Sequence, residues 1–159
     1  MLPDLDRRLE AALTTAGISP DLLEVEITET AAMKNVQQSA RTLLKLRQLG
    51  ISVSIDDFGT GYSSLAYLRQ FAVDAIKIDK SFVDDIGVDG NAEAICEAIL
   101  RLGQALGCRV IAEGVESETQ IAFLHRRQCD EVQGYFFSQP VSAREFESNW
   151  LRAPALVEA

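Results

Sequence analysis

The chain has 159 residues, of which 47% are hydrophobic and 25% are charged, so it is long enough to bury a core. We expect one domain over residues 1–159. Its 24 acidic residues outnumber the 15 basic ones and give a net charge of −9, which disfavours binding to a nucleic acid polymer. No apolar run approaches the ~20 residues that cross a bilayer, and the start does not resemble a signal peptide, so a cytoplasmic location is expected.

Helical and strand periods of apolar residues alternate along the chain. Helices are expected over residues 5–15, 36–49, 63–71 and 91–106, from Ser117 onward, and over 142–151. Phe146 and Trp150, one turn apart, are expected to anchor the last helix. Strands are expected over residues 22–29, 51–56, 73–79, 108–113 and 132–137.

This alternation predicts an α/β fold of about five parallel βα units. A complete eight-stranded barrel usually needs ~250 residues. The pattern therefore fits either an open sheet or a partial TIM-like barrel that lacks the first strands.

The stretch from Ile51 to Leu65 combines a strand, an acidic pair and a glycine turn. Apolar and polar residues alternate, which places Asp56 and Asp57 at the carboxyl end of the strand, where α/β enzymes keep reactive groups. Ser63 is a candidate N-cap for the following helix. Two adjacent carboxylates repel each other unless water, a proton or a cation compensates them. A metal ion is one interpretation, and an Asx-type turn that caps backbone amides is the other.

Near the end of each expected strand, one polar residue lies on the face opposite the apolar side chains. These residues are Glu26, Asp56, Lys77, Glu113 and Gln133. In parallel neighbouring strands they would converge at one edge, with Asp57 beside them. Carboxylate and amide oxygens suit Mg²⁺ or Mn²⁺, and two such ions could share Asp56 and clamp an in-line phosphoryl displacement. Lys77 could hold the attacking water or neutralise developing charge, or it could pair with Asp79 instead.

Five short motifs follow one another in a fixed order. They are Glu-Ile-Thr-Glu at 26–29, Asp-Asp-Phe-Gly-Thr-Gly-Tyr-Ser-Ser-Leu at 56–65, Ile-Lys-Ile-Asp at 76–79 with Phe82-Val83, Glu-Gly-Val-Glu at 113–116, and Gln-Gly-Tyr at 133–135. Together they resemble the EAL-domain family, the bacterial phosphodiesterases that hydrolyse the second messenger cyclic di-GMP. The order and spacing agree with the family from Leu22 to Pro140.

The resemblance implies a TIM-like barrel and a two-metal site, holding Mg²⁺ or Mn²⁺, that hydrolyses one phosphodiester to give linear pGpG. It also implies roles for residues at matching positions. The metal ligands would be Glu26, Asp56, Asp57 and Glu113, the residues orienting water and the metal shell would be Lys77 and Gln133, and the loop anchor would be Glu29. Glu113 is also the candidate for activating the water.

The family's Glu-Ala-Leu strand and its metal-binding asparagine would precede the first strand seen here, and this sequence contains neither. We therefore expect a C-terminal portion of the EAL domain with an incomplete metal site. Three hypotheses follow: a phosphodiesterase portion completed by an upstream segment, a non-catalytic cyclic di-GMP-binding or protein-interaction module, and an unrelated metal-dependent α/β enzyme. Besides cyclic di-GMP, the expected partner is a second copy or an upstream segment that pairs with the exposed edge strands.

Overall fold

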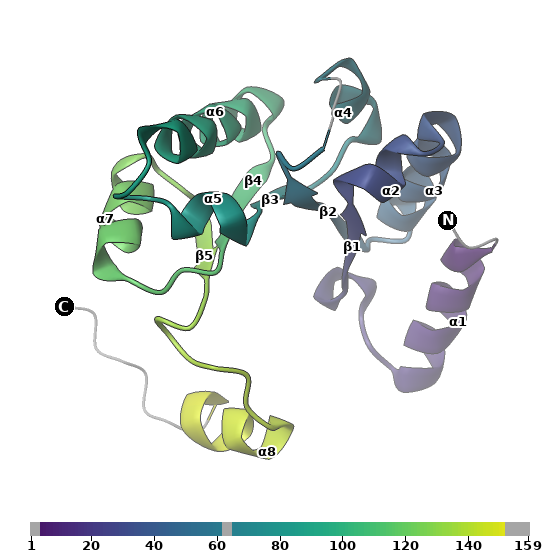
Figure 1. Ribbon diagram of the computed structural model, residues 1–159. Coiled ribbons are helices and arrows are strands. Elements are labelled where there is room, and N and C mark those ends of the chain that lie inside the picture. Colours follow the sequence, from purple (N-terminus) through teal and green to yellow (C-terminus); the bar gives the residue numbers. More distant parts are fainter. Residues whose placement is uncertain (1–3, 62–64, 152–159) are drawn as a thin grey trace.

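The computed structural model describes residues 4–61 and 65–151. At its centre lies one sheet of five parallel strands in the order β1-β2-β3-β4-β5 (Figure 1). The strands are β1 (Glu24–Thr28), β2 (Ser52–Phe58), β3 (Ala75–Ile78), β4 (Arg109–Glu113) and β5 (Glu131–Gln133). Helices connect consecutive strands, so the predicted α/β fold of five parallel βα units is confirmed.

The helices include three that the sequence did not predict, η1, α2 and α5. The described residues form the helices α1 (Leu5–Ala16), η1 (Pro20–Leu22), α2 (Glu29–Met33), α3 (Val36–Gln48), α4 (Leu65–Phe71), α5 (Lys80–Asp84), α6 (Gly90–Leu106), α7 (Glu118–Arg126), α8 (Ala143–Phe146) and η2 (Glu147–Leu151). With five residues each, α2 and α5 are too short to show a helical period. Among the helices in the described parts of the chain, none is long and apolar enough to cross a membrane.

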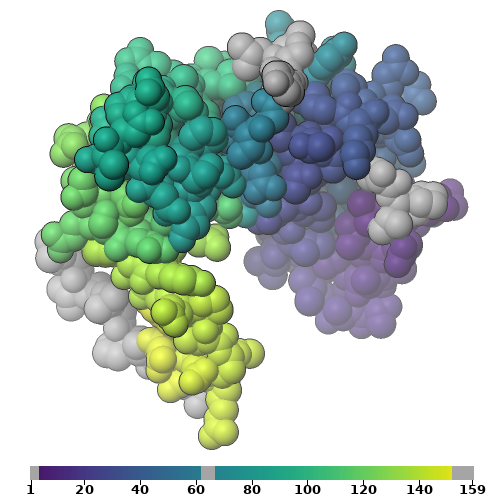
Figure 2. Space-filling view, in the orientation of Figure 1, coloured from purple at the N-terminus to yellow at the C-terminus, as the bar shows by residue number. Residues whose placement is uncertain are grey.

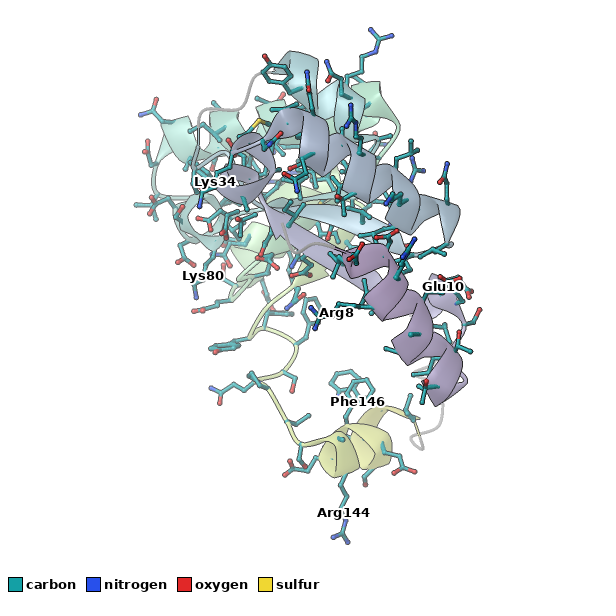
Figure 3. All side chains as sticks on the ribbon, turned by 90° about the vertical axis from the view of Figure 1, so that its right-hand side faces the viewer. Arg8, Glu10, Lys34, Lys80, Arg144 and Phe146 are labelled. Atoms are coloured by element: carbon teal, nitrogen blue, oxygen red, sulfur yellow. The ribbon has the colours of Figure 1, made fainter. Side chains whose placement is uncertain are left out.

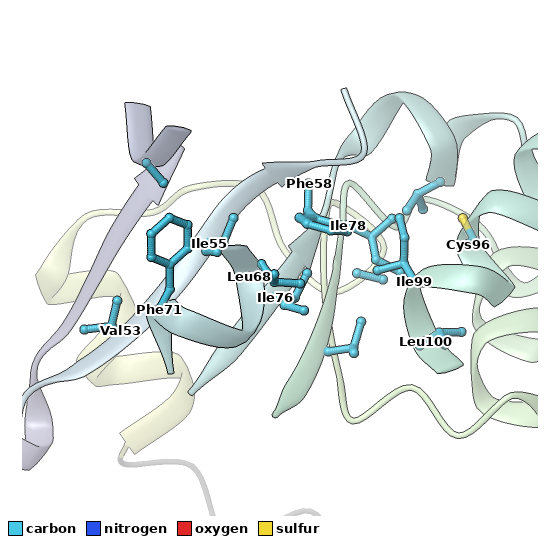
Figure 4. Packing of buried hydrophobic residues seen from close by; sticks show 14 of the residues in the cluster. Val53, Ile55, Phe58, Leu68, Phe71, Ile76, Ile78, Cys96, Ile99 and Leu100 are labelled. Atoms are coloured by element: carbon cyan, nitrogen blue, oxygen red, sulfur yellow. The ribbon is translucent and has the colours of Figure 1, made fainter. Parts of the chain in front are cut away.

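The apolar side chains of the strands face the helices and form the core. Valine and isoleucine side chains of β2 and β3 are completely buried and pack against α4 and α6 (Figure 4). The contributing residues are Val53, Ile55, Ile76 and Ile78 from the strands and Leu68, Phe71, Ile99 and Leu100 from the helices. The alternate residues of each strand point to the other face of the sheet, where the polar side chains lie.

The strand β2 extends past its predicted end at Asp56 and stops at Phe58. Its pairing with β3 shifts register between Ile55 and Phe58, and Asp57 has a φ of 54°. This left-handed conformation is tolerated by aspartate better than by most side chains. The candidate N-cap Ser63 lies outside the described residues.

The strand β5 is shorter than the prediction of 132–137 and ends at Gln133. Gly134 lies directly against the backbone of Val115, so that a side chain at this position would overlap Val115. Beyond it, the Phe136 amide donates a hydrogen bond of 2.9 Å to the Val115 carbonyl instead of continuing a ladder. The predicted strand is therefore wrong over residues 134–137, because the loop after β4 takes up these backbone groups.

The C-terminal helical segment is present, but its predicted anchoring is wrong. α8 and η2 project from the rest of the molecule (Figure 2). Phe146 and Trp150 remain 48% and 47% exposed, and they line an open groove with Tyr135 and Val141. Figure 3 shows Phe146 pointing from α8 toward the body of the molecule, whereas Arg144 points away from it. Among the described residues, no buried core side chain meets these two aromatic rings.

Candidate active site

Lys77, the inward-facing residue of β3, lies at the centre of the polar face. It is only 5% exposed. Its Nζ lies 2.6 Å from Glu26 Oε1, 2.6 Å from Glu113 Oε1 and 3.7 Å from Asp56 Oδ1. These partners come from β1, β4 and β2, so the sheet brings together four of the five polar strand-end residues, with three carboxylates around the ammonium group of the fourth.

The charges around Lys77 determine its protonation. Burial alone lowers the pKa of Lys77, but the hydrogen bonds that it donates to Glu113 and Glu26 and the nearby charges of Glu113 and Asp56 raise it well above its usual value. Lys77 is therefore a permanent cation at neutral pH. The alternative pairing with Asp79 is not adopted, because the Asp79 carboxylate caps α5 and accepts a hydrogen bond of 3.0 Å from the Ser81 amide.

Asp57, the residue after Asp56, lies in an environment that disfavours its ionised form. Its pKa is raised by partial burial and then by the negative charges of Asp56 and Asp79. Asp56 also accepts a hydrogen bond of 3.0 Å from the Asp57 amide, so the Asx-type interpretation describes part of the local geometry. The raised pKa of Asp57 nevertheless marks a position where added positive charge would be favourable.

Glu29, the first residue of α2, connects this helix to the glycine turn after β2. It is 1% exposed, and its Oε2 accepts a hydrogen bond of 2.9 Å from the Gly59 amide. Its Oε1 has no hydrogen-bond partner among the described residues and lies so close to Gly61 that any side chain there would meet it. The contact joins the segment after Asp57 to the end of β1.

Gln133 lies at the end of β5 on the rim of an open cavity. The cavity has a volume of about 470 Å³ and extends between the two edge strands, β1 and β5. Its lining includes Glu26, Lys77 and Gln133. The fifth polar strand-end residue thus shares a cavity with the Lys77 cluster, although no hydrogen bond from its side chain to the cluster is found in the described residues.

A second charged group on the same face was missed at the sequence level. Arg109 of β4 donates hydrogen bonds to Glu24 Oε2 at 3.0 Å and to Glu131 on β5. The contact between Arg109 and Glu24 spans β2 and β3, so the sheet is strongly curved around its polar face. Glu24 and Glu131 each lie two positions before the predicted site residue of their strand, and Arg109 lies four positions before its own. Their side chains therefore point to the same face of the sheet. Extending the period-two pattern back along each strand could have found them.

The segments that follow β3, β4 and β5 form another contact that was not predicted from the sequence. Lys80 Nζ lies 2.5 Å from Glu116 Oε1 and 5.7 Å from the centre of the Tyr135 ring. The stem of Lys80 crosses Gly114, where no side chain would fit. The segments after β3, β4 and β5 are thereby connected. The Glu-Gly-Val-Glu motif at 113–116 was visible in the sequence, but the pairing of Glu116 with Lys80 was not.

The donor set fits a hard divalent cation, since every candidate ligand is a carboxylate. The consecutive carboxylates Asp56 and Asp57 and the raised pKa of Asp57 favour a cation at the end of β2. In this structure, however, Glu26 and Glu113 point to Lys77. Across residues 4–61 and 65–151, no three acidic, histidine or cysteine side chains are grouped closely enough to hold a metal ion.

Comparison with protein families decides the membership of the chain. The family described as EAL domain matches residues 2–140. The chain belongs to the EAL domain family. The resemblance drawn from the five motifs is thus confirmed.

Curated relatives share this region at high identity. Cyclic di-GMP phosphodiesterase NbdA of Pseudomonas aeruginosa is 49% identical over 142 residues, which cover 89% of this chain and 18% of NbdA. Signaling protein YkoW of Bacillus subtilis is 45% identical over 152 residues, which cover 96% of this chain and 19% of YkoW. The chain therefore spans about a fifth of the length of these relatives.

Solved structures of EAL enzymes have the same arrangement of strands and helices. The PaMucR phosphodiesterase in complex with c-di-GMP matches with a TM-score of 0.87 and 38% identity, over 90% of this chain and 58% of that one. Klebsiella pneumoniae BlrP1, in a manganese and c-di-GMP complex, matches with a TM-score of 0.80 and 38% identity, over 87% and 36% of the two chains. The five parallel strands are thus part of the TIM-like barrel of this family.

Proposed function

We propose that this chain forms the part of a cyclic di-GMP phosphodiesterase that carries most of its catalytic face, and that the reaction yields linear pGpG. The observation that carries the proposal is the convergence of Glu26, Asp56 and Glu113 on the buried Lys77 at the carboxyl ends of parallel strands. Relatives named as cyclic di-GMP phosphodiesterases and a structural neighbour that holds c-di-GMP support the substrate class.

Four carboxylates are proposed as ligands for two Mg²⁺ or Mn²⁺ ions: Glu26, Asp56, Asp57 and Glu113. Bound ions of this kind activate water and stabilise the charge of an in-line phosphoryl displacement. Such binding requires Glu26 and Glu113 to exchange part of their contact with Lys77 for the cations. The relatives' complexes with manganese and calcium support the use of divalent ions.

The remaining residues are proposed to position the reacting groups. Lys77 would orient the nucleophilic water or balance the charge of the transition state, because it is a fixed cation inside the cluster. Gln133 would orient the water and the metal shell from the cavity rim, and Glu29 would anchor the turn after Asp57 through Gly59. We further propose a cytoplasmic location, where cyclic di-GMP is the expected partner.

A second candidate is a module that binds cyclic di-GMP or a protein without turnover. It is favoured by the pairing of Glu26 and Glu113 with Lys77, which leaves no group of three metal-binding side chains within the described residues. In this case the chain would bind the dinucleotide, but divalent ions would not promote hydrolysis.

The test is a hydrolysis assay with cyclic di-GMP and Mn²⁺, in which pGpG is measured by chromatography. It is made on the 159-residue chain and on a longer chain that also supplies the family's Glu-Ala-Leu strand. Asp56→Asn removes a negative ligand with little change of shape, so it should abolish the metal-dependent activity while the fold remains. Asp85→Asn, at an exposed position beyond α5, serves as the matched control and should keep the full rate. Binding without any Mn²⁺-dependent turnover, even in the longer chain, would establish the second candidate instead.

A further inference from the structure

Arg109 links the edge strand β1 to the opposite side of the sheet. Its guanidinium group donates through Nη2 to Glu24 on β1 and through Nη1 to Glu131 on β5. The planar fork of an arginine can hold two carboxylates at once in a fixed geometry, which a lysine ammonium does with less directionality. Three strands of the sheet, β1, β4 and β5, are thereby connected by a single side chain.

The register of the strands places this bridge directly below the Lys77 cluster. Arg109 pairs with Ala75 and Ile111 pairs with Lys77, so Arg109 lies one inward-facing step before the level of Lys77. Glu24 lies one such step before Glu26 on β1. Two cations therefore lie in successive layers, and each one contacts a glutamate of the same short strand.

The ion pairs Glu26–Lys77 and Glu24–Arg109 connect β1 through side chains to β3 and β4. Through its backbone, β1 pairs with β2 alone among the described strands. Glu24, Glu26 and Glu131 also line the same cavity as Lys77. Without the guanidinium group, Glu24 and Glu131 would face this cavity uncompensated and would compete with Glu26 for the ammonium of Lys77.

We infer that Arg109 is a positioning residue for the site: it holds Glu24 and Glu131, and thereby keeps Glu26 and Glu113 as the partners of Lys77. The inference rests on the proposed function in that this cluster is the catalytic one. A purely structural bridge would stabilise the fold but would leave the surroundings of Lys77 unchanged. The two roles differ in what happens at the Lys77 ammonium group.

The test follows the lysine ammonium groups by NMR, in the full chain labelled with ¹⁵N-lysine and at one fixed pH. The chain has only four lysines, Lys34, Lys45, Lys77 and Lys80, and the Lys77 signal is assigned by its loss in Lys77→Met. In Arg109→Met we expect the ¹⁵N shift of Lys77 to move and its hydrogens to exchange with water several-fold faster. Arg101→Met is the matched control, because Arg101 pairs with Glu97 on the surface of α6. It should leave the Lys77 signal unchanged.

Two milder variants keep the inference testable if Arg109→Met does not fold. Glu24→Gln removes the link to β1 and should shift the Lys77 signal, and Arg109→Lys should give an intermediate shift because its ammonium keeps the charge without the fork. An unchanged Lys77 signal in folded Arg109→Met and Glu24→Gln would overturn the inference. This readout uses no substrate, so a failure of cyclic di-GMP hydrolysis in the longer chain would overturn the proposed function without deciding this point.

Discussion

A buried lysine usually tends toward the neutral form, but Lys77 lies where carboxylates outnumber it. The three carboxylates of Glu26, Asp56 and Glu113 surround one ammonium group, so the formal charge of the cluster is −2. An anionic phosphodiester would be repelled by this excess of negative charge. Bound cations would offset this charge, which connects the residue-scale electrostatics to the proposed use of divalent ions.

The ionised form of Asp57 is predicted to cost stability when no metal is present. Because its pKa is raised above 3.8, the folded state binds the proton more readily than the unfolded state, and stability falls as pH rises through the raised pKa. Asp57→Asn removes this charge and suits the left-handed backbone at φ 54°. At neutral pH with a chelator present, we expect a melting temperature a few degrees higher, measured by circular dichroism.

The control for this prediction is Asp85→Asn, which changes an exposed aspartate outside the site and should leave the melting temperature nearly unchanged. The advantage of Asp57→Asn should shrink as the pH is lowered toward 3.8, since the wild-type carboxyl group then becomes protonated as well. A lower melting temperature of Asp57→Asn under chelation would show that this carboxylate stabilises the fold.

At the scale of residues, the sequence allowed the cluster to be predicted because side chains in a strand repeat with a period of two. That period, taken together with the position near each strand end, singled out Glu26, Asp56, Lys77, Glu113 and Gln133. The partners of Lys77 could not be predicted, since they depend on how strongly the sheet curves. The same reason applies to the contact between Arg109 and Glu24, which joins residues 85 positions apart, although the period-two pattern places both residues on the polar face.

At the scale of elements, long helices and buried strands were predictable, whereas elements fixed by individual hydrogen bonds were not. The helix after Ser117 was predicted correctly, since Ser117 and Gln120 form a capping box that the sequence displays. By contrast, α5 depends on a cap from Asp79, a residue that could equally have paired with Lys77. The end of β5 depends on backbone contacts with the distant residue Val115, for which the local sequence carries no signal.

The junction between β5 and the loop after β4 should not tolerate a side chain at Gly134. A Cβ there would overlap the backbone nitrogen and oxygen of Val115, whose amide bonds the Gln133 carbonyl at 3.0 Å. Gly134→Ala is expected to lower the free energy of unfolding by about 1–3 kcal/mol, as overpacking does elsewhere. Urea denaturation measures this loss.

Gly90→Ala provides the comparison for Gly134→Ala. Gly90 is the first residue of α6, and an added Cβ would meet no atom within 4 Å. Because alanine favours helix formation over glycine, this variant should be neutral or slightly stabilised. Equal stabilities of the two variants would mean that the contact between Gly134 and Val115 relaxes without cost.

At the scale of the whole molecule, the sheet encloses its polar face only partly. β1 and β5 are the two ends of the strand order, and the cavity lined by Glu26 and Lys77 opens between them. A closed barrel satisfies the backbone groups of every strand, whereas an open one presents two edges. The charges that the sheet brings together are therefore accessible from the side as well as from the carboxyl ends of the strands.

These edges lead to the prediction that the 159-residue chain associates with itself. Within the part of the chain that the structure describes, β1 pairs only with β2 and β5 only with β4, and an exposed edge is a template for strand addition. Sedimentation velocity over a range of concentrations should show dimers or larger species, and a segment that supplies the family's Glu-Ala-Leu strand should reduce them. The double variant Phe146→Ser with Trp150→Ser tests the exposed aromatic groove beside α8, and association should persist in it if the edges are responsible. A single monomeric species at every concentration would contradict the prediction, and loss of association in the double variant would assign it to the groove.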